Sequence, residues 1–371
     1  MNARAVLILI GTRPEAVKLA PVVHRLRQSP FLTPVVCSTG QHKEMLESAL
    51  AEFDIHPDMD LAVMAPGQTL NELAGRIFLG LAAALREIVP ACILVQGDTT
   101  SALVGAMSGF YAQIPVGHVE AGLRSGDMYA PYPEEFNRRA AALAATWHFA
   151  PTRRAAENLV RENVDPGQVF ITGNTVVDAL LSMREKIRAA PPRLPEAIEE
   201  LLRKKTPYVL ITGHRRENFG KGMEDICRAI ASLARSHPEC AFLYPVHLNP
   251  QVGSVAGQRL GGLSNVFLLP PCAYRPFLRL MDNSLFIISD SGGIQEEAPS
   301  FGKQVLVTRA ATERPEGVEA GVCRLVGTDV EKIVAMAEEL FITAASYGVV
   351  PNPYGDGKAA ERIVSLLEER L

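Results

Sequence analysis

The sequence predicts an α/β protein with two doubly wound parallel sheets, and three observations support this fold class. The 371 residues exceed the roughly 100 to 200 residues of one typical domain, so we expect two domains. Short apolar runs alternate with helical patterns, as they do where helices cross over a parallel sheet. The alternation forms two series, separated by a Pro/Ala/Arg-rich segment at residues 188–195. Ligands of such sheets bind beyond the carboxyl ends of the strands, so we also expect a cleft between the domains.

Each apolar run is expected to form one strand. The first series comprises residues 5–10, 33–38, 91–95, 115–119 and 146–150, and the second comprises residues 208–212, 241–246, 266–269, 285–289 and 304–308. A further short strand ends at the polar turn Thr172-Gly173-Asn174-Thr175, so we divide the chain into an N-terminal domain, 1–172, and a C-terminal domain, 173–357. The last segment, 358–371, carries apolar residues at helical spacing, and we expect this helix to pack back on the first domain.

Composition and charge exclude several classes of protein. With 47% hydrophobic and 21% charged residues, the chain is neither disordered nor fibrous. The net charge of -4 provides no basic surface for nucleic acid. The apolar run 5–10 is far shorter than the roughly 20 residues of a membrane helix, and no small-residue cleavage site follows it. We therefore expect no membrane segment, no secretory signal and a cytoplasmic location. The six cysteines are scattered singly, which favours reduced thiols over a zinc or redox site.

The turn after the first predicted strand suits an anionic ligand. Gly11-Thr12-Arg13-Pro14 leads into a helix, with Pro14 in its first turn and Arg13 beside its start. Backbone N–H groups at a helix start and a nearby guanidinium attract phosphate. No G-x-G-x-x-G pattern occurs here, which argues against a dinucleotide of the usual kind. The alternative is that Arg13 pairs with Glu15 on a surface turn.

Three acidic groups of the first domain follow predicted strands or open a helix. Asp98 and Glu120 come just after two apolar runs, and Glu134 opens a helix behind two prolines. Carboxylates crowded in a partly desolvated site titrate at different pH, which lets one act as an acid while another acts as a base. The alternative for Asp98, and for Glu134 or its neighbour Glu135, is helix capping and compensation of the helix dipole.

The second domain offers groups for a diphosphate and a ribose. His214 follows a predicted strand beside Arg215 and is a candidate for gripping a leaving diphosphate. Ser291-Gly292-Gly293 follows another strand, and its glycines let backbone amides approach phosphate oxygens. A Glu one turn further on can accept hydrogen bonds from both ribose hydroxyls. His247 lies at a similar strand exit, where a turn with a satisfied histidine is an equal alternative.

In their order along the chain, these motifs are similar to those of the bacterial non-hydrolysing UDP-N-acetylglucosamine 2-epimerases. The matching stretches are GTRPEAVKLAP (11–21), TGQHKEM (39–45), QGDTT (96–100), GHVEAGLRSGD (117–127), PEEFNRR (133–139), TGNTVVDAL (172–180), TGHRREN (212–218), YPVHLNP (244–250), SDSGGIQEEAPSFGK (289–303) and TERPEG (312–317). They span nearly the full length, and the combination is specific although no single stretch is.

The resemblance implies a glycosyltransferase-B-like fold of two Rossmann-like domains, with the active site in the cleft between them. It further implies a homodimer, a UDP-sugar ligand, and neither a metal nor a nicotinamide cofactor. The implied reaction is the reversible C2 epimerisation of UDP-N-acetylglucosamine to UDP-N-acetylmannosamine, which serves polysaccharide biosynthesis. UDP leaves as the C2 proton leaves, an enzyme-bound 2-acetamidoglucal forms, and UDP adds back after reprotonation on the other face.

By motif match, the resemblance also assigns roles to residues. It implies that Asp98 and Glu134 are the acid/base pair, that Glu120 supports the oxocarbenium-like state and that His214 assists the leaving UDP. The implied substrate-binding residues are Arg13, Lys18, Arg138, Arg215, Ser291, Gly292, Gly293 and, on the ribose, Glu297 with Glu296 as its alternative. Some family members carry a second, activating substrate site, which Gln41 and His42 match, and His247 is a further cleft candidate. Gly67 stands where that site has an Arg, which argues against substrate activation.

Three other functions are known alternatives for such a sequence, and its residues disfavour each of them. A glycosyltransferase has little use for three carboxylates around C2. A hydrolysing epimerase is disfavoured by the Pro-Glu pair of GTRPEA, and a non-catalytic sensor could lose acidic residues that are all present here. An epimerase of a related UDP-2-acetamido sugar stays open as an alternative, because loops set the specificity at C3 and C6.

Overall fold

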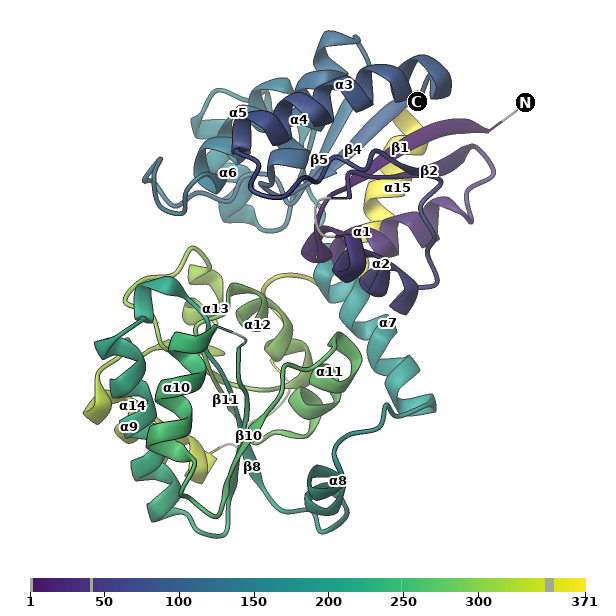
Figure 1. Cartoon of the computed structure of the whole chain (residues 1–371). Coiled ribbons are helices and arrows are strands. Elements are labelled where there is room, and N and C mark those ends of the chain that lie inside the picture. The colour runs from purple at the N-terminus through teal and green to yellow at the C-terminus, as the bar shows by residue number, and fades with distance from the viewer. Residues whose placement is uncertain (1–2, 41–42, 248, 344–349) are drawn as a thin grey trace. The chain divides into compact units, whose positions relative to one another are not determined.

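The computed structural model of the chain describes residues 3–40, 43–247, 249–343 and 350–371. It consists of two compact units, one formed by residues 1–179 with 354–371 and the other by residues 180–353 (Figure 1). The chain passes between them after Ala179 and again after Pro353, whereas the sequence pattern places the passages after residues 172 and 357. Each unit holds one parallel sheet, so the predicted α/β class with two doubly wound sheets is confirmed.

The first unit is built on a seven-stranded parallel sheet. Its strands lie in the order β3 (Met59–Asp60), β2 (Leu32–Ser38), β1 (Arg4–Ile10), β4 (Cys92–Gln96), β5 (Val116–Val119), β6 (Trp147–Ala150) and β7 (Val169–Ile171). The five predicted strands of the first series are all present, within one residue at each end. Strand β3 was not predicted, because its two residues, one of them charged, make no apolar run.

Helices cover both faces of this sheet, since a parallel strand that is apolar on both sides has to be buried on both sides. They are α1 (Arg13–Leu26), α2 (Lys43–Glu52), α3 (Leu70–Ile88), α4 (Thr100–Tyr111), α5 (Glu134–Ala144), α6 (Arg153–Arg161) and the start of α7 (Thr175–Ala189). Leu7 and Leu9 of β1 are buried together with Ile93 and Val95 of β4 in one core cluster. Each such side chain stabilises the fold by roughly 1.5–3 kcal/mol relative to an exposed one.

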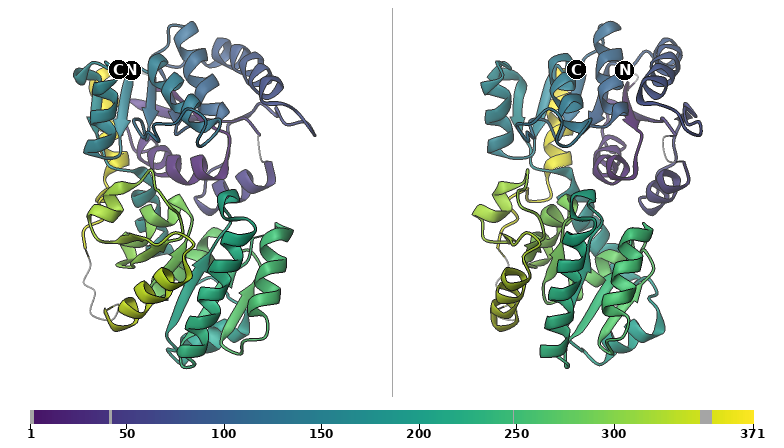
Figure 2. Two further views of the ribbon diagram at one scale, coloured as in Figure 1. Left: turned by 90° about the vertical axis from the view of Figure 1, so that its left-hand side faces the viewer. Right: turned by 60° about the vertical axis from the view of Figure 1, so that its left-hand side comes forward.

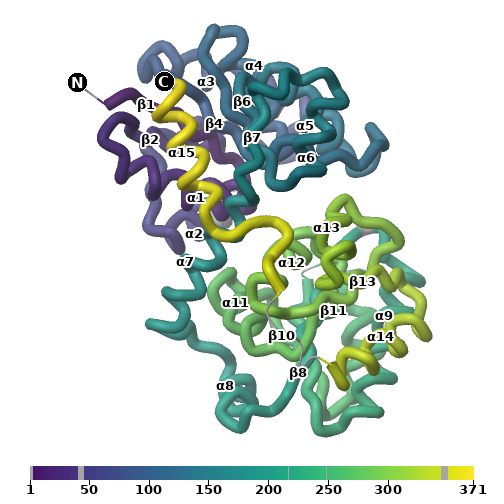
Figure 3. Tube along the Cα trace, turned by 180° about the vertical axis from the view of Figure 1, so that it is seen from behind, coloured from purple at the N-terminus to yellow at the C-terminus, as the bar shows by residue number. Residues whose placement is uncertain are grey.

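The C-terminal helix α15 (Ala359–Arg370) belongs to the first unit and packs against α1 (Figure 3). Its first backbone N–H groups are bound by a side chain of another helix: Asp178 of α7 accepts hydrogen bonds from Ala359 at 3.2 Å and Ala360 at 2.9 Å. A carboxylate at a helix start also interacts favourably with the helix dipole. Asp178 thereby fixes the place where the returning chain re-enters helical structure.

The second unit is built on a six-stranded parallel sheet. The order is β10 (Val266–Leu269), β9 (Ala241–Pro245), β8 (Tyr208–Thr212), β11 (Ile287–Ser289), β12 (Val305–Val307) and β13 (Cys323–Leu325). The five predicted strands are present within two residues at each end, and β13 is additional. The flanking helices, visible in Figure 2, are α8 (Glu196–Arg203), α9 (Lys221–Ser236), α10 (Pro250–Leu260), α11 (Tyr274–Asn283), α12 (Gly292–Glu297), α13 (Pro315–Glu319) and α14 (Val330–Thr343).

Both sheets reverse their strand order at one point, between β1 and β4 in the first unit and between β8 and β11 in the second. In doubly wound sheets, ligands bind beyond the carboxyl ends of the strands at this reversal. The segments that follow these four strands are therefore the places where functional side chains are expected, and they contain most of the predicted site residues.

Candidate functional site

The turn after β1 is organised by a buried carboxylate. Glu15 accepts hydrogen bonds from the backbone N–H groups of Gly11 at 3.0 Å and Thr12 at 2.7 Å, and from the Thr99 hydroxyl at 2.7 Å. Burial raises the pKa of Glu15 to about 7, although the hydrogen bonds from Thr99 and Thr12 oppose the increase. The alternative of an Arg13–Glu15 pair on a surface turn is wrong, because Glu15 is buried. Glu15 instead joins the turn that carries Arg13 to the turn that carries Asp98.

Asp98, which lies after β4, is held by a residue of α5. Arg138 donates to Asp98 Oδ2 from Nε at 3.1 Å and from Nη2 at 2.5 Å, and to Glu135 Oε2 from Nη1 at 3.1 Å. The Asn137 side chain also donates to the Asp98 carbonyl at 2.9 Å. Asp98 is not a helix cap, because the Thr99 hydroxyl caps α4. Both Arg138 bonds go to Oδ2, which leaves Oδ1 of Asp98 available to a ligand.

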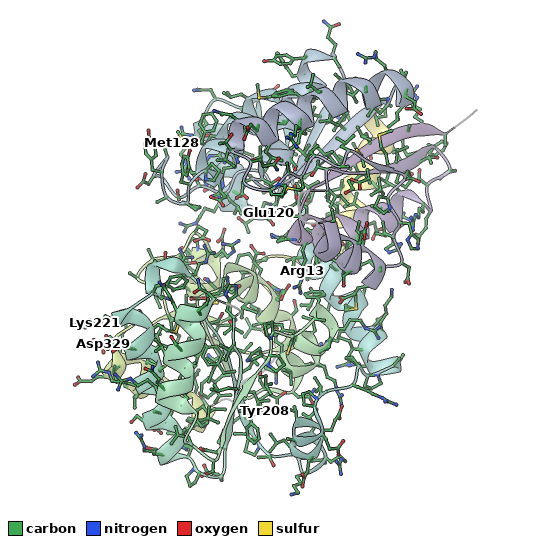
Figure 4. The ribbon with its side chains drawn as sticks, viewed as in Figure 1. Arg13, Glu120, Met128, Tyr208, Lys221 and Asp329 are labelled. Carbon is green, nitrogen blue, oxygen red and sulfur yellow. The ribbon has the colours of Figure 1, made fainter. Side chains whose placement is uncertain are left out.

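Glu120 follows β5 in a left-handed conformation, with φ 63, which costs a residue other than glycine backbone energy and often marks a functional position. Its Oε2 is bound by the Lys18 ammonium group and by the Asn174 side-chain amide, the latter at 2.9 Å. A Cβ atom added to Gly97 would lie 3.9 Å from the other oxygen, Oε1. The structure thus brings Lys18, Glu120 and the turn before Asp98 together. Arg13 and Glu120, both at the carboxyl edge of this sheet, are labelled in Figure 4.

Glu134 is the first residue of α5, and its Oε2 is buried without a hydrogen-bond partner. The next residue, Glu135, is fully buried and accepts the Ser125 N–H at 3.0 Å as well as Arg138. Neither glutamate is the N-cap, which is Pro133, so the capping alternative is wrong, although both lie in the first turn, where the helix dipole favours negative charge. Glu135 Oε1 is likewise buried without a hydrogen-bond partner, so both glutamates at the start of α5 keep one unbonded oxygen.

In the second unit, Asp290 fixes the turn after β8. It is fully buried at the end of β11 and accepts the backbone N–H groups of His214 at 3.0 Å and Arg215 at 2.9 Å, and the Asn218 amide at 3.2 Å. The His214 and His247 rings lie side by side, with centroids 5.8 Å apart. Burial lowers the pKa of His214, Arg215 and His247 lower it further, and Asp290 opposes them. The lowered pKa favours the neutral imidazole, which can donate one ring N–H.

The loop between β11 and α12 carries the predicted phosphate-binding residues. The Ser291 N–H is bound by the Ser289 hydroxyl at 3.0 Å, and Gly292 and Gly293 open α12. Gly292 lies directly against a guanidinium, because an added Cβ would be 2.5 Å from Arg314 Nη1. Only glycine fits at this position without moving Arg314.

The two candidate ribose ligands have different partners. Glu296 is buried and accepts Arg314 Nε at 2.6 Å, whereas Glu297 accepts the Tyr274 hydroxyl at 3.1 Å. Both candidate ribose ligands are therefore held in place by a neighbouring side chain.

Charged side chains of the second unit form a network around Glu313. Arg309 donates to Glu313 at 2.8 Å and to Glu217 at 2.7 Å, and Arg314 also binds Glu313. Arg215 Nη2 lies 3.9 Å from the same carboxylate. Burial alone would raise the pKa of Glu313, but Arg314 and Arg309 outweigh burial and hold it at about 2. The network holds three guanidinium groups around Glu313, and one of them, that of Arg314, lies against Gly292 in the loop between β11 and α12.

Several of these residues were absent from the sequence-based site: Glu15, Glu135, Asn174, Asp290, Glu313 and Arg314. Asp290 could have been found, because it follows a predicted strand directly. The partners of the others depend on contacts across the fold. Gln41 and His42, the candidates for a second substrate site, lie outside the described residues.

The residues that the structure describes offer neither a metal site nor a membrane-crossing helix. None of the groups of histidine, cysteine and acidic side chains in those residues is arranged to hold a metal ion. No helix in the same residues combines the length and the apolar character that a membrane crossing requires.

Over nearly its whole length, the chain is similar to proteins described as UDP-N-acetylglucosamine 2-epimerases. Residues 24–368 match the family model described as UDP-N-acetylglucosamine 2-epimerase. The UDP-N-acetylglucosamine 2-epimerase of Escherichia coli strain K12 is 49% identical over 368 residues, which cover 98% of each chain. The crystal structure of UDP-GlcNAc 2-epimerase from Neisseria meningitidis bound to UDP-GlcNAc superposes with a TM-score of 0.90 at 43% identity, and the match covers 98% of this chain and 100% of that one. A glycosyltransferase structure from Rickettsia africae shares the fold alone, with a TM-score of 0.64 at 12% identity over 100% of this chain and 99% of that one.

Proposed function

The chain belongs to the UDP-N-acetylglucosamine 2-epimerase family, and we propose that it inverts the configuration at C2 of UDP-N-acetylglucosamine to give UDP-N-acetylmannosamine. The observation that carries this proposal is the 49% identity to a relative of that name over 98% of both chains. The residues of each unit are consistent with it, since the first unit supplies several carboxylates and the second supplies groups suited to a diphosphate.

The proposed reaction is an elimination followed by the reverse addition. A base removes the proton from C2, the bond between C1 and the UDP oxygen breaks, and its electron pair leaves with UDP. A C1–C2 double bond results, so the intermediate is 2-acetamidoglucal. A proton then reaches C2 from the other face, and the UDP oxygen bonds to C1 again. Atoms and electrons balance without an oxidant or water, and inversion requires proton-transferring groups on both faces of the ring.

The carboxylates of the first unit suit the two faces of the sugar. We assign Asp98 and Glu134 as the acid/base pair on the motif match, and two contacts support it: Asp98 Oδ1 receives neither of the Arg138 bonds, and Glu134 Oε2 is buried without a hydrogen-bond partner. Glu120 supports the positive charge that develops on the ring as UDP departs, a role that fits a buried carboxylate held in one place. Lys18 and Arg138 hold these carboxylates in the resting enzyme.

The second unit is proposed to bind the UDP moiety. Backbone amides at Gly292 and Gly293 approach the phosphates, Ser291 assists them, and Glu297 accepts the ribose hydroxyls. Neutral His214 donates a hydrogen bond to the departing diphosphate, and the Arg215 guanidinium, like Arg13 of the first unit, offsets its charge.

We also propose a homodimer formed through the first unit. Large apolar side chains are exposed on three helices: Leu79 on α3, Phe110 and Tyr111 on α4, and Phe136 and Leu143 on α5. Helix α4 packs against both α3 and α5, so these helices are neighbours. Exposed apolar patches of this kind mark interaction surfaces.

The decisive experiment is incubation of the purified protein with UDP-N-acetylglucosamine alone in heavy water. Formation of the manno epimer with deuterium at C2, while UDP stays attached, is the expected result. A parallel sample of the Asp98→Asn variant serves as the catalytic control. Release of free N-acetylmannosamine would identify a hydrolysing enzyme instead. Exchange that occurs only with another UDP-2-acetamido sugar would reassign the substrate.

A further inference from the structure

The two oxygens of the Glu120 carboxylate have different surroundings. Oε2 receives both hydrogen bonds, one from the Lys18 ammonium group and one from Asn174 Nδ2 at 2.9 Å. Oε1 is turned toward Gly97, the residue before Asp98. A lysine ammonium is a point charge on a flexible stem and restricts direction poorly, whereas a planar amide donates along one direction. The orientation of Glu120 therefore depends on Asn174.

Asn174 is itself fixed by hydrogen bonds of its side chain and of its backbone. Its side chain is buried, and Oδ1 accepts the Val176 N–H at 3.1 Å. That bond identifies the amide oxygen, so the nitrogen has to face Glu120. Its own backbone N–H donates to the Tyr354 carbonyl at 2.7 Å, in the segment that returns to the first unit.

The two chain segments that meet at Asn174 are in backbone contact. A Cβ atom on Gly173 would lie 3.4 Å from the Gly355 Cα, and one on Gly355 would lie 3.3 Å from the Asn174 nitrogen. Both glycines also have positive φ, 88 and 151, which other residues rarely adopt. Positive φ favours glycine at both positions, and at Gly355 a side chain would also crowd the Asn174 backbone nitrogen.

We infer that Asn174 is a positioning residue for the C2 epimerisation: it holds Glu120 Oε2 so that Oε1 stays turned toward the Asp98 turn. The inference rests on the proposed function, in which Glu120 acts on the sugar. Asn174 immediately precedes α7, the helix through which the chain passes to the second unit. Its hydrogen bond therefore connects Glu120 to the start of that helix.

Asn174→Ala removes the amide donor and tests this role. The expected result is a kcat that is roughly ten- to a hundredfold lower, because small displacements of a catalytic group have effects of that size. KM should change less than threefold, since Asn174 is not proposed to touch substrate. Asn158→Ala is the matched control: Asn158 Nδ2 donates to the Gly122 carbonyl at 2.9 Å, in the same loop as Glu120 but away from its carboxylate.

The pH dependence of kcat in Asn174→Asp distinguishes a positioning role from a merely structural one. A protonated Asp side chain can donate an O–H bond to Oε2 in place of the amide, whereas an ionised one repels Glu120. The ratio of variant to wild-type kcat should therefore be highest near pH 5 and fall severalfold or more toward pH 8. Asn158→Asp, tested alongside, should show a ratio that stays flat with pH.

The outcomes distinguish failure of the proposed function from failure of the inference about Asn174. Wild-type and Asn158 variants that are all inactive would overturn the proposed function and this inference with it. An active wild type whose Asn174 and Asn158 variants behave alike would overturn the inference alone. Should Asn174→Ala fail to fold, as judged by circular dichroism, the pH dependence of Asn174→Asp decides.

Discussion

At the scale of single residues, the carboxylates of the first unit differ mainly in their partners. Glu15 is bound by hydroxyl and amide groups, Asp98 by a guanidinium, and Glu120 by an ammonium and an amide. Glu134 keeps a buried oxygen without a partner. Carboxylates of one unit can therefore serve different purposes, because the neighbours decide which of their oxygens are bound and which remain available.

Removal of either proposed acid/base group should slow turnover strongly. We expect Asp98→Asn and Glu134→Gln each to lower kcat by roughly two to four powers of ten, the usual contribution of a general acid or base. The measurement is the initial rate of epimerisation, followed by the anomeric proton signals of the two UDP-sugars. Asp165→Asn, at an exposed turn of the same unit, is the control and should be normal. A near-normal rate in either test variant would remove that residue from the pair.

The buried Glu15 makes stability depend on pH in a defined direction. Its pKa is raised from 4.5 to about 7 on folding, so the folded chain holds this proton more tightly than the unfolded chain. The associated stability is complete below pH 4.5 and is lost as pH rises through 7. In Glu15→Gln this dependence disappears. The free energy of unfolding of wild type relative to Glu15→Gln should fall by up to about 3 kcal/mol between pH 4.5 and 8.

Urea unfolding at several pH values measures this difference. Glu72 is a matched control, because it closes the same type of capping box with Thr69 at the start of α3 but is exposed. Hydrogen bonds from Thr69 lower the pKa of Glu72, so its stabilising effect is present throughout the range from pH 5 to 8. Glu72→Gln should therefore show no slope there, and an equal slope in both variants would show that burial of Glu15 is not the cause.

At the scale of elements, the loop from β11 to α12 packs closely against one side chain, that of Arg314. Arg314 lies against Gly292 and is held by Glu296 and Glu313. The short helix α12 can start here only because glycine leaves room for the guanidinium. The loop, the network around Glu313 and the turn after β8 therefore form one interlocked group in the second unit.

Gly292→Ala should disrupt this group. The added Cβ would lie 2.5 Å from Arg314 Nη1, so the guanidinium has to shift from the position in which Nη1 binds Glu313 and Nε binds Glu296. Loss of one charge-assisted hydrogen bond, about 1.5–3 kcal/mol, should weaken UDP binding roughly tenfold or more, as measured by titration calorimetry. Gly253→Ala is the control, because Gly253 lies within α10 with open space around it. Unchanged affinity in Gly292→Ala would show that Arg314 adapts at little cost.

At the scale of the whole molecule, large apolar side chains are exposed on three neighbouring helices, α3, α4 and α5. Leu143 is 85% exposed and Tyr111 is 70% exposed, although both are costly to hydrate. Association through these helices would bury them, and a stable interface commonly removes about 800 Å² of surface from each partner.

A charge on this surface should separate the proposed dimer. We expect Leu143→Glu to convert a dimer into a monomer at micromolar concentration, because an ionised carboxylate is costly to bury. Light scattering after gel filtration gives the mass. Ile342→Glu is the matched control, since Ile342 is 81% exposed on α14 of the second unit. A wild type that is already monomeric, or a Leu143→Glu variant that stays dimeric, would reject this interface.

Much of this protein could be deduced from local patterns along the chain. Ten strands are visible as apolar runs, because a strand buried on both faces needs nearly continuous apolar residues. Asp98, Glu120, His214 and Ser291 could be picked out for the same reason, since each follows such a strand by one or two residues. Strands β3 and β13, of two and three residues, carry too few side chains for such a pattern. The order of the motifs also indicated the family that the comparisons established.

The partners of the site residues were decided only by tertiary structure. Arg138 reaches Asp98 across 40 positions, Asn174 reaches Glu120 across 54, and the His214 backbone reaches Asp290 across 76. Such pairs depend on which strands become neighbours, and strand order is set by packing of the whole sheet, which no local pattern encodes. The sequence alone therefore located the chemical groups of this protein, whereas the fold determined which of their atoms are bound and which remain available to a ligand.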